Sequence, residues 1–297
     1  MFTLFEDCSH FPESDISKID FEYTDLLENG EPDYNAIKNK LKSFYKVIYM
    51  QRSRGYSLRD SLSSHVTKKS IEFIKAVSPK SIVLIDNCYG EFVERSEPTK
   101  FGADLIVGSL IKNPGGGIAP CGGYIAGRRS LIKECSYRLT APGVGREIGA
   151  TLGHNREMFM GAFNSPHTVG EALKSAVFAS ALFELLGYEV FPRYCDYRSD
   201  IVQSIKLKTP KALILFCQGL QMGSPVDSFV VPEPWDMPGY NDKVIMAAGT
   251  FTLGLSIELS ADAPLREPYA VWMQGGINFH SAKAGILIAV NHMLNNL

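Results

Sequence analysis

The chain has 297 residues, of which 45% are hydrophobic and 21% are charged, with a formal net charge of −2. This composition is ordinary for a soluble globular protein, and the length is sufficient for two domains. The near-neutral charge argues against an electrostatic nucleic-acid binder, and no apolar run approaches the length of a membrane span.

The six cysteines lie far apart and include no C-x-x-C pair, which argues against a zinc knuckle and against a compact disulfide framework. The simplest interpretation is six reduced thiols in a cytoplasmic protein. The N-terminal residues MFTLFEDCSHFPESD carry no basic stretch followed by an apolar one. They therefore do not predict a signal peptide.

Short apolar runs alternate with helical patterns in the first half of the chain. Apolar, β-branched runs predict buried strands, and apolar residues at helical spacing predict helices. After a mixed lead-in, we expect strands at 21–27, 46–50, 81–85, 103–107 and 122–127 and helices at 32–44 and 63–77. The alternation favours an α/β layer with a mainly parallel sheet, in whose last strand Tyr124 and Ile125 point inward.

The pattern changes after Pro166. An alanine-rich helix is expected at 167–186, closed by Gly187 in the C′ position. The remaining expected elements are strands at 212–216, 229–231, 244–251 and 270–273 and a last helix at 280–294. Together these elements predict a large domain at 1–165 and a smaller α+β domain at 166–297.

Polar segments follow three of the predicted strands. In parallel sheets, ligands bind beyond the carboxyl ends of the strands. The segments 52–56, 86–89 and 109–112 all begin at such ends. The sequence therefore predicts that they converge on one edge of the sheet.

Lys112 follows a predicted strand and precedes Asn113-Pro114-Gly115-Gly116-Gly117. The glycines match no phosphate loop, because a Walker A lysine follows its glycines, and they open no helix as a dinucleotide fingerprint must. A lysine at a strand end can project into a cleft, but taken alone this one is typical of a surface lysine.

Asp86 ends a buried apolar strand, where an unpaired charge would be unfavourable. A helix cap or a loop salt bridge would explain such an aspartate. With Lys112 one strand later, however, the pair also matches what pyridoxal phosphate (PLP) needs. A lysine binds that cofactor covalently, and an aspartate keeps its pyridine nitrogen protonated.

Several segments resemble the PLP enzymes of cysteine and methionine metabolism. LIDNCYGEF (84–92) and GSLIKNPGGG (108–117) resemble the aspartate and lysine motifs of that family. QRSRGYS (51–57), LTAPGVGREIGATLG (139–153), GSPVDSFVVPEPWDMPGY (223–240) and IELSADAPLREPY (257–269) are similar to a bacterial branch of methionine gamma-lyase-like or aluminium-resistance proteins. The similarity runs from about Tyr23 to the C-terminus.

The resemblance implies a PLP-dependent transferase-like fold (fold-type I) and a set of cofactor contacts. Lys112 would be the Schiff-base lysine, Asp86 the partner of the pyridine nitrogen and Ser109 a contact of the phosphate. The loop after the strand at 46–50 lies where relatives contact the ring hydroxyl. The cofactor-binding candidates are therefore Lys112, Asp86, Ser109, Ser53, Arg54 and Tyr89.

Substrate contacts are less clearly implied. Arg54 and Arg266 are both candidates for the substrate carboxylate, since a guanidinium offers a bidentate fork. The wider family places that arginine in a strand before the last helix, but here the corresponding VWMQGG (271–276) has none. Tyr56 is a further substrate-binding candidate, and Tyr56 and Tyr89 are candidates for acid–base groups or for packing.

Compared with the family, the sequence also predicts a large domain truncated at its N-terminus. Before Asp86 there is no glycine-containing turn opening a helix, the device that binds the phosphate in such enzymes. We therefore expect part of the sheet and the main phosphate cup to be missing.

The resemblance implies a PLP-dependent carbon–sulfur lyase that acts on a sulfur-containing amino acid as a homodimer or homotetramer, without nucleic acid, membrane or metal. Methionine, cystathionine and cysteine, and β- and γ-elimination, all remain open. The alternative is a catalytically impaired, truncated homologue that serves as a structural partner. A dinucleotide-binding protein is more remote, because its glycine fingerprint is absent.

Overall fold

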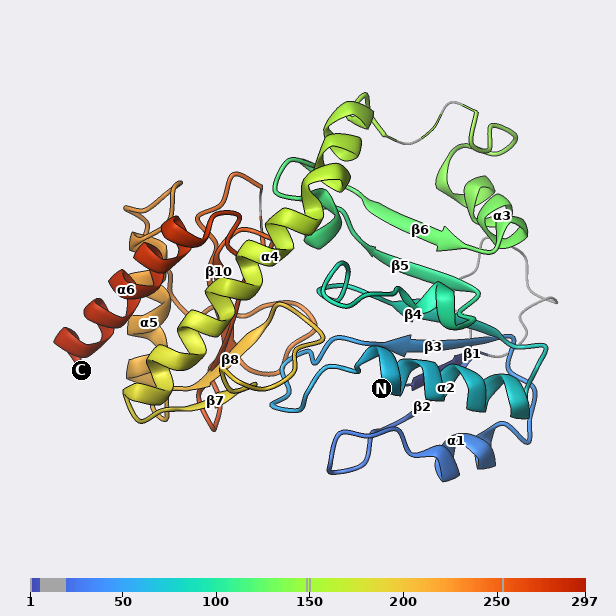
Figure 1. The fold of residues 1–297 in the computed structure, drawn as a ribbon, viewed down its shortest axis with the longest axis horizontal. Helices are drawn as coiled ribbons and strands as arrows, with labels where there is room; N and C mark the ends of the chain where they lie inside the picture. The colour runs from blue at the N-terminus through green and yellow to red at the C-terminus, as the bar shows by residue number, and fades with distance from the viewer. Residues whose placement is uncertain (1, 6–19, 148, 150, 253) are drawn as a thin grey trace. The chain divides into compact units, whose positions relative to one another are not determined.

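The computed structural model describes residues 2–5, 20–147, 149, 151–252 and 254–297. Cys8 and two residues of the 139–153 segment lie outside this part of the chain. The described residues form two compact units, drawn in Figure 1. The first comprises Met1–Arg54, Ser61–Gly108 and Gly123–Gly153, and the second comprises Gly55–Asp60, Ser109–Gly122 and His154–Leu297.

A six-stranded sheet forms the centre of the first unit. Its strand order is β2-β1-β3-β4-β5-β6, and β3, β4 and β5 are parallel, as the sequence predicted. The strand β1 was not predicted; it pairs antiparallel with both β2 and β3 and so covers the edge of β3. The bounds are β1 Phe2–Phe5, β2 Phe21–Thr24, β3 Val47–Gln51, β4 Ile82–Asp86, β5 Leu105–Ser109 and β6 Gly123–Gly127.

Alternating burial along β3 and β4 builds the core of the first unit. Ile48 and Met50 of β3 and Val83 and Ile85 of β4 are fully buried. They pack with residues of α1 (Tyr34–Lys40) and α2 (Ser64–Val77) in one hydrophobic cluster. Burying each large side chain contributes roughly 1.5–3 kcal/mol. This core fixes the carboxyl ends of β3 and β4.

Local capping explains where the first two helices begin. The Asp33 side chain accepts hydrogen bonds from two backbone N–H groups at the start of α1, and the Ser63 side chain accepts one from Val66 N. Such caps satisfy backbone donors that have no partner inside the helix.

Two features of the first unit differ from the prediction. The helix α3 (Arg129–Leu139) was not expected, and Ile125 is 44% exposed and so does not point inward.

The second unit contains a five-stranded antiparallel sheet with strand order β7-β8-β11-β10-β9. The helices α4 and α5 contact this sheet, and α6 contacts both helices (Figure 1). Their shared core includes Phe183, Phe216 and Met293. The bounds are β7 Glu189–Phe191, β8 Gln203–Lys206, β9 Val244–Ala247, β10 Ser260–Pro264, β11 Ala270–Gln274, α4 Asn155–Leu185, α5 Pro210–Met222 and α6 Phe279–Asn296.

The prediction of a strand at 212–216 is wrong, because these residues lie inside α5. A short apolar run has no periodicity that separates a buried strand from a buried helix. The signal that decides the matter lies just upstream, where the Thr209 side chain accepts from Ala212 N at 3.1 Å and Pro210 occupies the first turn. The expected strand at 229–231 is also wrong, and the one at 244–251 is shortened to β9.

The helix α4 begins twelve residues before the predicted start at 167 and contains Pro166. Proline removes one backbone donor and usually ends or kinks a helix. Here buried residues lie on both sides of it, including Gly161, Ser165 and Thr168. We infer that tertiary packing outweighs the local proline signal. The boundary at residue 165, drawn from this proline, stays a prediction.

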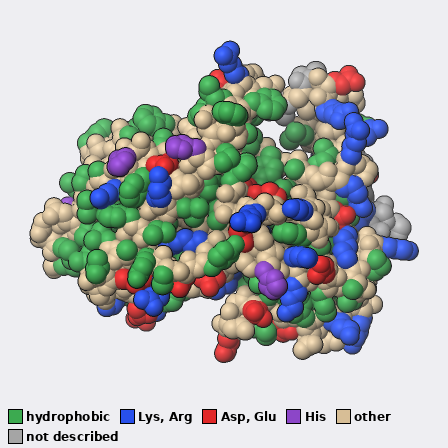
Figure 2. All heavy atoms as spheres, viewed as in Figure 1, with side chains coloured by type: hydrophobic (Ala, Val, Ile, Leu, Met, Phe, Trp, Pro, Cys, Tyr) green, Lys and Arg blue, Asp and Glu red, His purple; other side chains and the backbone are tan. Residues whose placement is uncertain are grey.

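The surface of the second unit carries many apolar side chains, and hydrophobic atoms gather over α4 and α6 on the face shown in Figure 2. On the first half of α4, Phe159 is 76% exposed and Phe163 is 85% exposed.

Within the described part of the chain, no helix has the length and apolarity that crossing a membrane requires.

Candidate active site

Asp86 is the last residue of β4, and each of its carboxylate oxygens accepts a hydrogen bond. The Tyr49 hydroxyl donates to Asp86 Oδ2 at 3.0 Å, and Cys88 N donates to Oδ1 at 3.0 Å. Burial, followed by the neighbouring Asp86 charge, raises the pKa of Tyr49 above its ordinary value. The phenol therefore stays protonated at neutral pH and serves as a donor to the aspartate.

The polar residues after β3 lie beside Asp86, as neighbouring parallel strands require. Gln51 pairs with Asp86 in the sheet, and Arg52 N donates to Asp86 O at 3.1 Å. Ser53 Oγ accepts from Gln51 Nε2 at 2.9 Å. The predicted convergence is thus confirmed for these two strand ends.

The Arg52 side chain forms hydrogen bonds with three separate segments of the first unit. Its guanidinium donates to Leu62 O at 3.1 Å, to Asn87 Oδ1 at 2.5 Å and to Glu94 Oε2 at 2.6 Å, and the residue is 2% exposed. A side chain at Gly90 would place its Cβ 2.7 Å from Arg52 Nη1, so this turn needs a glycine. Because three groups already engage the guanidinium, we assign Arg52 a structural role.

The two other candidates of the first unit differ from Arg52. Arg54 is 4% exposed, and Tyr89 is half-buried. Tyr89 has a φ of 71°, a left-handed conformation that is rare for residues other than glycine. Strained backbone often marks functional turns. The roles of both residues stay predictions.

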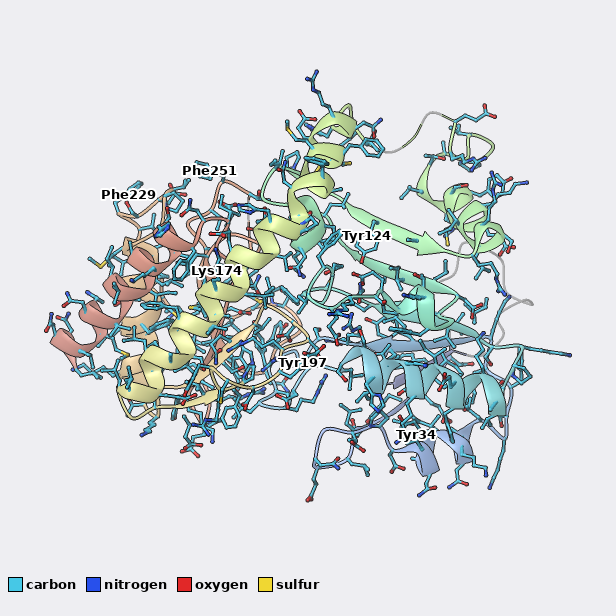
Figure 3. The ribbon with its side chains drawn as sticks, viewed as in Figure 1. Tyr34, Tyr124, Lys174, Tyr197, Phe229 and Phe251 are labelled. Atoms are coloured by element: carbon cyan, nitrogen blue, oxygen red, sulfur yellow. The ribbon has the colours of Figure 1, made fainter. Side chains whose placement is uncertain are left out.

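A second acid–tyrosine pair, missed from the sequence, lies on the same unit. Tyr124, labelled on β6 in Figure 3, donates its hydroxyl to Glu91 Oε1 at 2.8 Å. Glu91 is 3% exposed, and burial raises the pKa of its carboxyl to about 8. Glu91 is therefore mostly neutral at pH 7. Sequence reasoning could not find it, because the motif around residue 91 does not show that this side chain is buried.

In the second unit, two hydrogen bonds hold the backbone just before Lys112. Leu110 N donates to Gly122 O at 2.9 Å, and Ile257 N donates to Ile111 O at 3.0 Å. The short 3-10 helix η3 (Asn113–Gly115) follows at once. Lys112 is half-buried. Its side chain therefore starts from a well-defined position.

The glycines after Lys112 allow close packing against α4. Ser165 Oγ donates to Pro114 O at 2.7 Å, and Thr168 Oγ1 donates to Gly116 O at 3.3 Å. Gly116 has a φ of 57°, and a Cβ there would lie 2.5 Å from Gly161 O. These contacts explain the glycine run without a phosphate, which agrees with its poor match to phosphate loops.

Ser109 lines an open cavity of about 570 Å³ in the second unit. The cavity is formed by the segment before and after the lysine loop and by the loop that follows β9. Its lining residues are Ser109, Ile111, Pro120, Cys121, Gly122, Phe251 and Thr252. A serine hydroxyl in such a cavity can donate a hydrogen bond to an anionic ligand.

Tyr56 joins a buried carboxylate to an aromatic group. Its hydroxyl donates to Asp262 Oδ2, and its ring packs against Trp272 and Tyr240 with centroid distances of 5.3 Å and 5.4 Å. Burial raises the pKa of Asp262 to about 6, while the Tyr56 hydrogen bond and the Lys112 charge lower it. Asp262 was not predicted; the signal was an acid within the small-residue run Ser260–Pro264.

The two substrate-binding candidates of this unit line one cavity. Tyr56 and Arg266 border a space of about 250 Å³, together with Trp272. Arg266 Nη1 lies 3.0 Å from Asp242 Oδ2, and the Arg266 side chain is 52% exposed. Such a pair is weak and screened by solvent, so the guanidinium can exchange its partner for another carboxylate.

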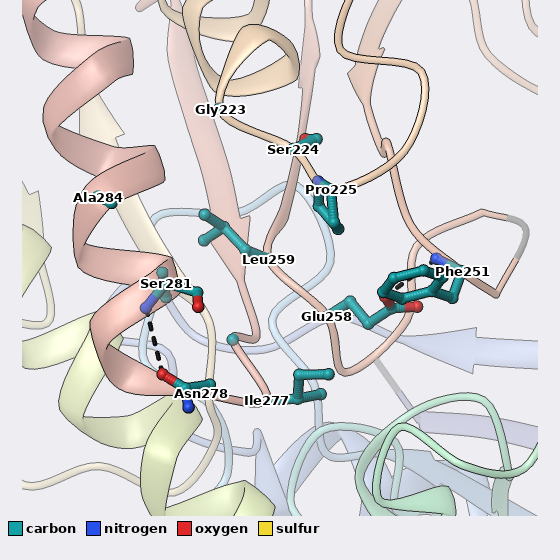
Figure 4. Close-up of a pocket in the computed structure, with 12 residues that line it drawn as sticks. Gly223, Ser224, Pro225, Phe251, Glu258, Leu259, Ile277, Asn278, Ser281 and Ala284 are labelled. Atoms are coloured by element: carbon teal, nitrogen blue, oxygen red, sulfur yellow. Dashed lines mark hydrogen bonds between the residues drawn. The ribbon is translucent and has the colours of Figure 1, made fainter.

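A further cavity of about 420 Å³ lies between the loop at 223–225, the loop at 251–259 and the start of α6 (Figure 4). Its lining is mainly apolar and includes Leu259 and Ile277. The Glu258 carboxylate at its edge accepts from Phe251 N at 3.0 Å and from Thr252 N at 2.9 Å. Asn278 accepts from Ser281 N at 3.2 Å, which caps α6. These polar groups are satisfied within the protein.

The described residues contain no group of three or more histidine, cysteine, aspartate or glutamate side chains placed to hold a metal ion. The described cysteines carry free thiols, namely Cys88, Cys121, Cys135, Cys195 and Cys217. The chemistry available at the candidate site therefore comes from an amine, carboxylates, phenols and guanidinium groups.

The sequence matches the family model of methionine gamma-lyase over residues 13–294. It is also 49% identical, over 93% of this chain and 90% of the relative, to a 33.9 kDa protein of Lactobacillus delbrueckii subsp. bulgaricus. The protein YnbB of Bacillus subtilis (strain 168) is 47% identical over 93% of this chain. The chain spans 66% of YnbB.

Solved structures show the same similarity. A Listeria innocua protein, provisionally named a cystathionine beta-lyase involved in aluminum resistance, superimposes with a TM-score of 0.88 at 48% identity, covering 92% of this chain and 67% of its own. A carbon–sulfur lyase involved in aluminum resistance from Clostridium novyi NT gives 0.85 at 51% identity, covering 91% and 63%.

More distant structures share the fold alone. The pyridoxal-5'-phosphate-dependent protein YhfS of Escherichia coli superimposes with a TM-score of 0.57 at 14% identity, covering 89% of this chain and 66% of its own. The α/β fold described above is thus similar to that of PLP-dependent enzymes, as the sequence predicted, whereas its truncation at the N-terminus and the separate C-terminal domain stay predictions.

Proposed function

The chain belongs to the methionine gamma-lyase family of PLP-dependent enzymes, and on this premise we propose that it is a carbon–sulfur lyase acting on a sulfur-containing amino acid. The observation that carries the proposal is Lys112. It lies three residues after the end of β5, the backbone just before it is held by two hydrogen bonds, and it is half-buried. These features suit an amine that must be held in one place.

The residues present fit PLP by their chemistry. We propose that Lys112 Nζ binds the cofactor covalently, that Asp86 pairs with its ring nitrogen and that Ser109 contacts its phosphate. The donor set around Asp86 supports this assignment, because the Tyr49 hydroxyl and Cys88 N hold the side chain in one orientation at the end of β4. When bound, the cofactor supplies an electron sink for bond cleavage next to the amino group.

Lys112 also serves as the general base in this proposal. Once released from the cofactor, its Nζ would take the proton from the α-carbon of the substrate, and a thiol would then leave by β- or γ-elimination. Arg54 and Arg266 are the proposed partners of the substrate carboxylate, and Tyr56 lies beside Arg266 in the same cavity. The thioether side chain would favour an apolar surface, which Trp272 supplies there.

The test uses the purified chain with PLP added. Visible absorbance during titration and dialysis reports covalent binding to a lysine, and assays with cystathionine, methionine and cysteine report release of thiol and keto acid. We expect colour and thiol release in the parent and neither in Lys112→Ala. A colourless, inactive parent would overturn the proposal and favour the alternative, a structural partner without activity.

We also propose that the protein self-associates. The support is the apolar exposure of Phe159 and Phe163 on α4, since exposed aromatic patches commonly mark interfaces. Light scattering after size separation should show a dimer or tetramer. Phe159→Ser with Phe163→Ser should shift it toward the monomer, and an unchanged size would exclude this surface.

A further inference from the structure

Asp262 is an acid inside a strand of the antiparallel sheet of the second unit. Its neighbours Ala261 and Ala263 on β10 belong to the hydrophobic core of this unit. Since successive side chains of a strand point to opposite faces, the Asp262 side chain lies on the face away from that core. Its register partner on β11 is Trp272, whose own strand neighbours also belong to the core. Asp262 and Trp272 therefore lie side by side on the same face of the sheet.

Three contacts hold the segment Gly55–Asp60 against this pair. The Tyr56 hydroxyl donates to Asp262 Oδ2, and the Tyr56 ring packs against the Trp272 indole with a centroid distance of 5.3 Å. Trp272 Nε1 donates to Ser57 O at 3.3 Å. Asp262 is 6% exposed and Trp272 is 5% exposed. The contacts and the burial agree in placing the segment over both side chains.

The same segment forms part of the cavity of about 250 Å³ that Arg266 lines. Tyr56 and Leu58 line this cavity from the segment, and Trp272 lines it from β11. In a ligand cavity, apolar side chains contact the body of the ligand and a few polar groups orient it. Here the apolar wall is built from two elements distant in sequence. Its shape therefore depends on what holds the segment in place.

The hydrogen bond to Asp262 is the directional contact of the Tyr56 side chain with the sheet. Ring contacts tolerate several geometries, whereas a hydrogen bond to a carboxylate fixes the position of the hydroxyl. Removing the acceptor would leave the hydroxyl without this partner in a half-buried position, which is unfavourable. We therefore expect Tyr56 to turn toward solvent when Asp262 is removed, and the segment to move with it.

We propose that Asp262 is a positioning residue for substrate binding, because it fixes Tyr56, and with it the segment Gly55–Asp60, as the wall of the cavity beside Trp272. Asp262 acts through the tyrosine. An amino acid whose carboxylate binds Arg266 would place its thioether chain against this wall. The inference deepens the proposed function and rests on it only for the identity of the ligand.

The first measurement needs neither cofactor nor substrate. The chain has two tryptophans, so Trp235→Phe leaves Trp272 as its only indole fluorophore. In this background, acrylamide quenching measures how well the segment covers Trp272. Asp262→Ala and Tyr56→Phe should each raise the quenching constant at least about twofold, because the segment opens locally. Asp262→Asn keeps an acceptor oxygen for the Tyr56 hydroxyl, so it should remain close to the parent.

Two exposed residues of the same unit provide matched controls. Glu189→Ala removes an exposed carboxylate of the same sheet, and Tyr194→Phe removes the hydroxyl of a half-exposed tyrosine. Neither should change the quenching constant. Urea unfolding shows whether each variant is folded. If Asp262→Ala does not fold, Tyr56→Phe decides, because it removes the same hydrogen bond and keeps the ring.

The second measurement connects the wall with the substrate. With PLP bound, Asp262→Ala and Tyr56→Phe should raise KM for methionine and cystathionine by about tenfold at constant kcat, since the ligand must then order the segment itself. Asp262→Asn should recover most of this loss. A role in stability alone would lower the urea midpoint but leave KM and the quenching of the folded state at parental values, and that result would overturn the proposal.

The two measurements also separate this proposal from the lyase assignment. An unchanged quenching constant in folded Asp262→Ala would overturn the positioning role, and raised quenching with a parental KM would overturn its connection with the substrate. If the parent has no lyase activity, the proposed function and that connection fail together. The quenching constant then still decides whether Asp262 positions the segment.

Discussion

Each unit of the molecule contains a buried carboxyl group that accepts a hydrogen bond from a tyrosine. Glu91 of the first unit is 3% exposed and has a pKa of about 8, whereas Asp262 of the second is 6% exposed and has a pKa of about 6. Burial raises both values. The two sites differ in their neighbouring charges: Lys112 stabilises the Asp262 carboxylate, whereas Glu97 opposes ionisation of Glu91 more than Arg52 favours it.

The comparison shows that one local arrangement can serve two purposes. Near pH 7 Glu91 is mostly protonated and acts as a neutral hydrogen-bonding group in a packed interior. Asp262 is mostly ionised at the same pH and can balance a cation. A buried acid–tyrosine pair therefore has no fixed protonation state, because burial raises the pKa of the acid while hydrogen bonds and nearby charges modify it.

The largest expected effect comes from replacing Lys112. In the proposed function, Lys112→Ala loses the cofactor-binding amine and the general base together, so lyase activity should fall at least about a thousandfold. Thiol release at saturating substrate is the measurement. Lys174→Ala, which removes an exposed lysine of α4, is the control. A Lys112→Ala variant that keeps a tenth of the parent activity would contradict the assignment.

Replacing Glu91 tests whether this buried carboxyl group is neutral near pH 7. The pKa of Glu91 is raised to about 8 from an ordinary value near 4.5, so the folded state binds a proton that the unfolded state releases between these values. Its contribution to the free energy of unfolding is fully present below about pH 4.5 and is lost as the pH rises through 8. Glu91→Gln remains neutral and should become more stable than the parent above pH 8, by an amount on the order of a few kcal/mol.

Urea unfolding at pH 5, 7 and 9 measures this difference. The free energy of unfolding of Glu91→Gln minus that of the parent should increase with pH. Glu72→Gln, at an exposed position on α2, should show no such trend. A constant difference for Glu91→Gln across the three pH values would show that Glu91 is ionised throughout.

Asp86 differs from Glu91 and Asp262 in its burial, because it lies at a strand end and is only half-buried. In the proposed function its charge stabilises the protonated ring nitrogen of PLP. Asp86→Asn keeps the shape but loses one charge-assisted hydrogen bond, worth roughly 1.5–3 kcal/mol, so PLP affinity should fall by about 10- to 150-fold. Titration followed by absorbance measures it. Tyr49→Phe should weaken PLP binding less, and equal affinity of Asp86→Asn and the parent would remove Asp86 from the cofactor site.

The sequence predicted the strands β3, β4 and β5 well, because each is a short apolar, β-branched run that ends at polar residues. It missed β10, whose residues SADAP contain an acid and a proline, since its burial comes from pairing with β9 and β11. The apolar run inside α5 was misassigned for the opposite reason: hydrophobicity alone does not distinguish a short strand from a helix.

The residues of the candidate site also fall into those that the sequence predicted and those that it did not. Lys112 and Asp86 were found because each follows a strand and lies within a segment that resembles a family motif. Asp262 and Glu91 were not, although both lie within quoted segments, because what matters about them is burial and the approach of a tyrosine distant in sequence. Tyr56 and Asp262 are 206 positions apart. Such pairs depend on the tertiary fold, and a single sequence contains no local signal for them.

The smallest expected effect concerns the arginines, which extend the comparison of the two units. Arg54 of the first unit is 4% exposed, whereas the Arg266 side chain of the second is 52% exposed and only weakly paired with Asp242. An exposed ion pair contributes at most about 1 kcal/mol, so Arg266→Ala should hardly change stability. If Arg266 binds the substrate carboxylate, its loss should raise KM about tenfold at constant kcat. Arg266→Lys should recover part of this affinity, because an ammonium keeps the charge but not the bidentate geometry. A parental KM in both variants would exclude Arg266 and leave Arg54 as the proposed carboxylate anchor.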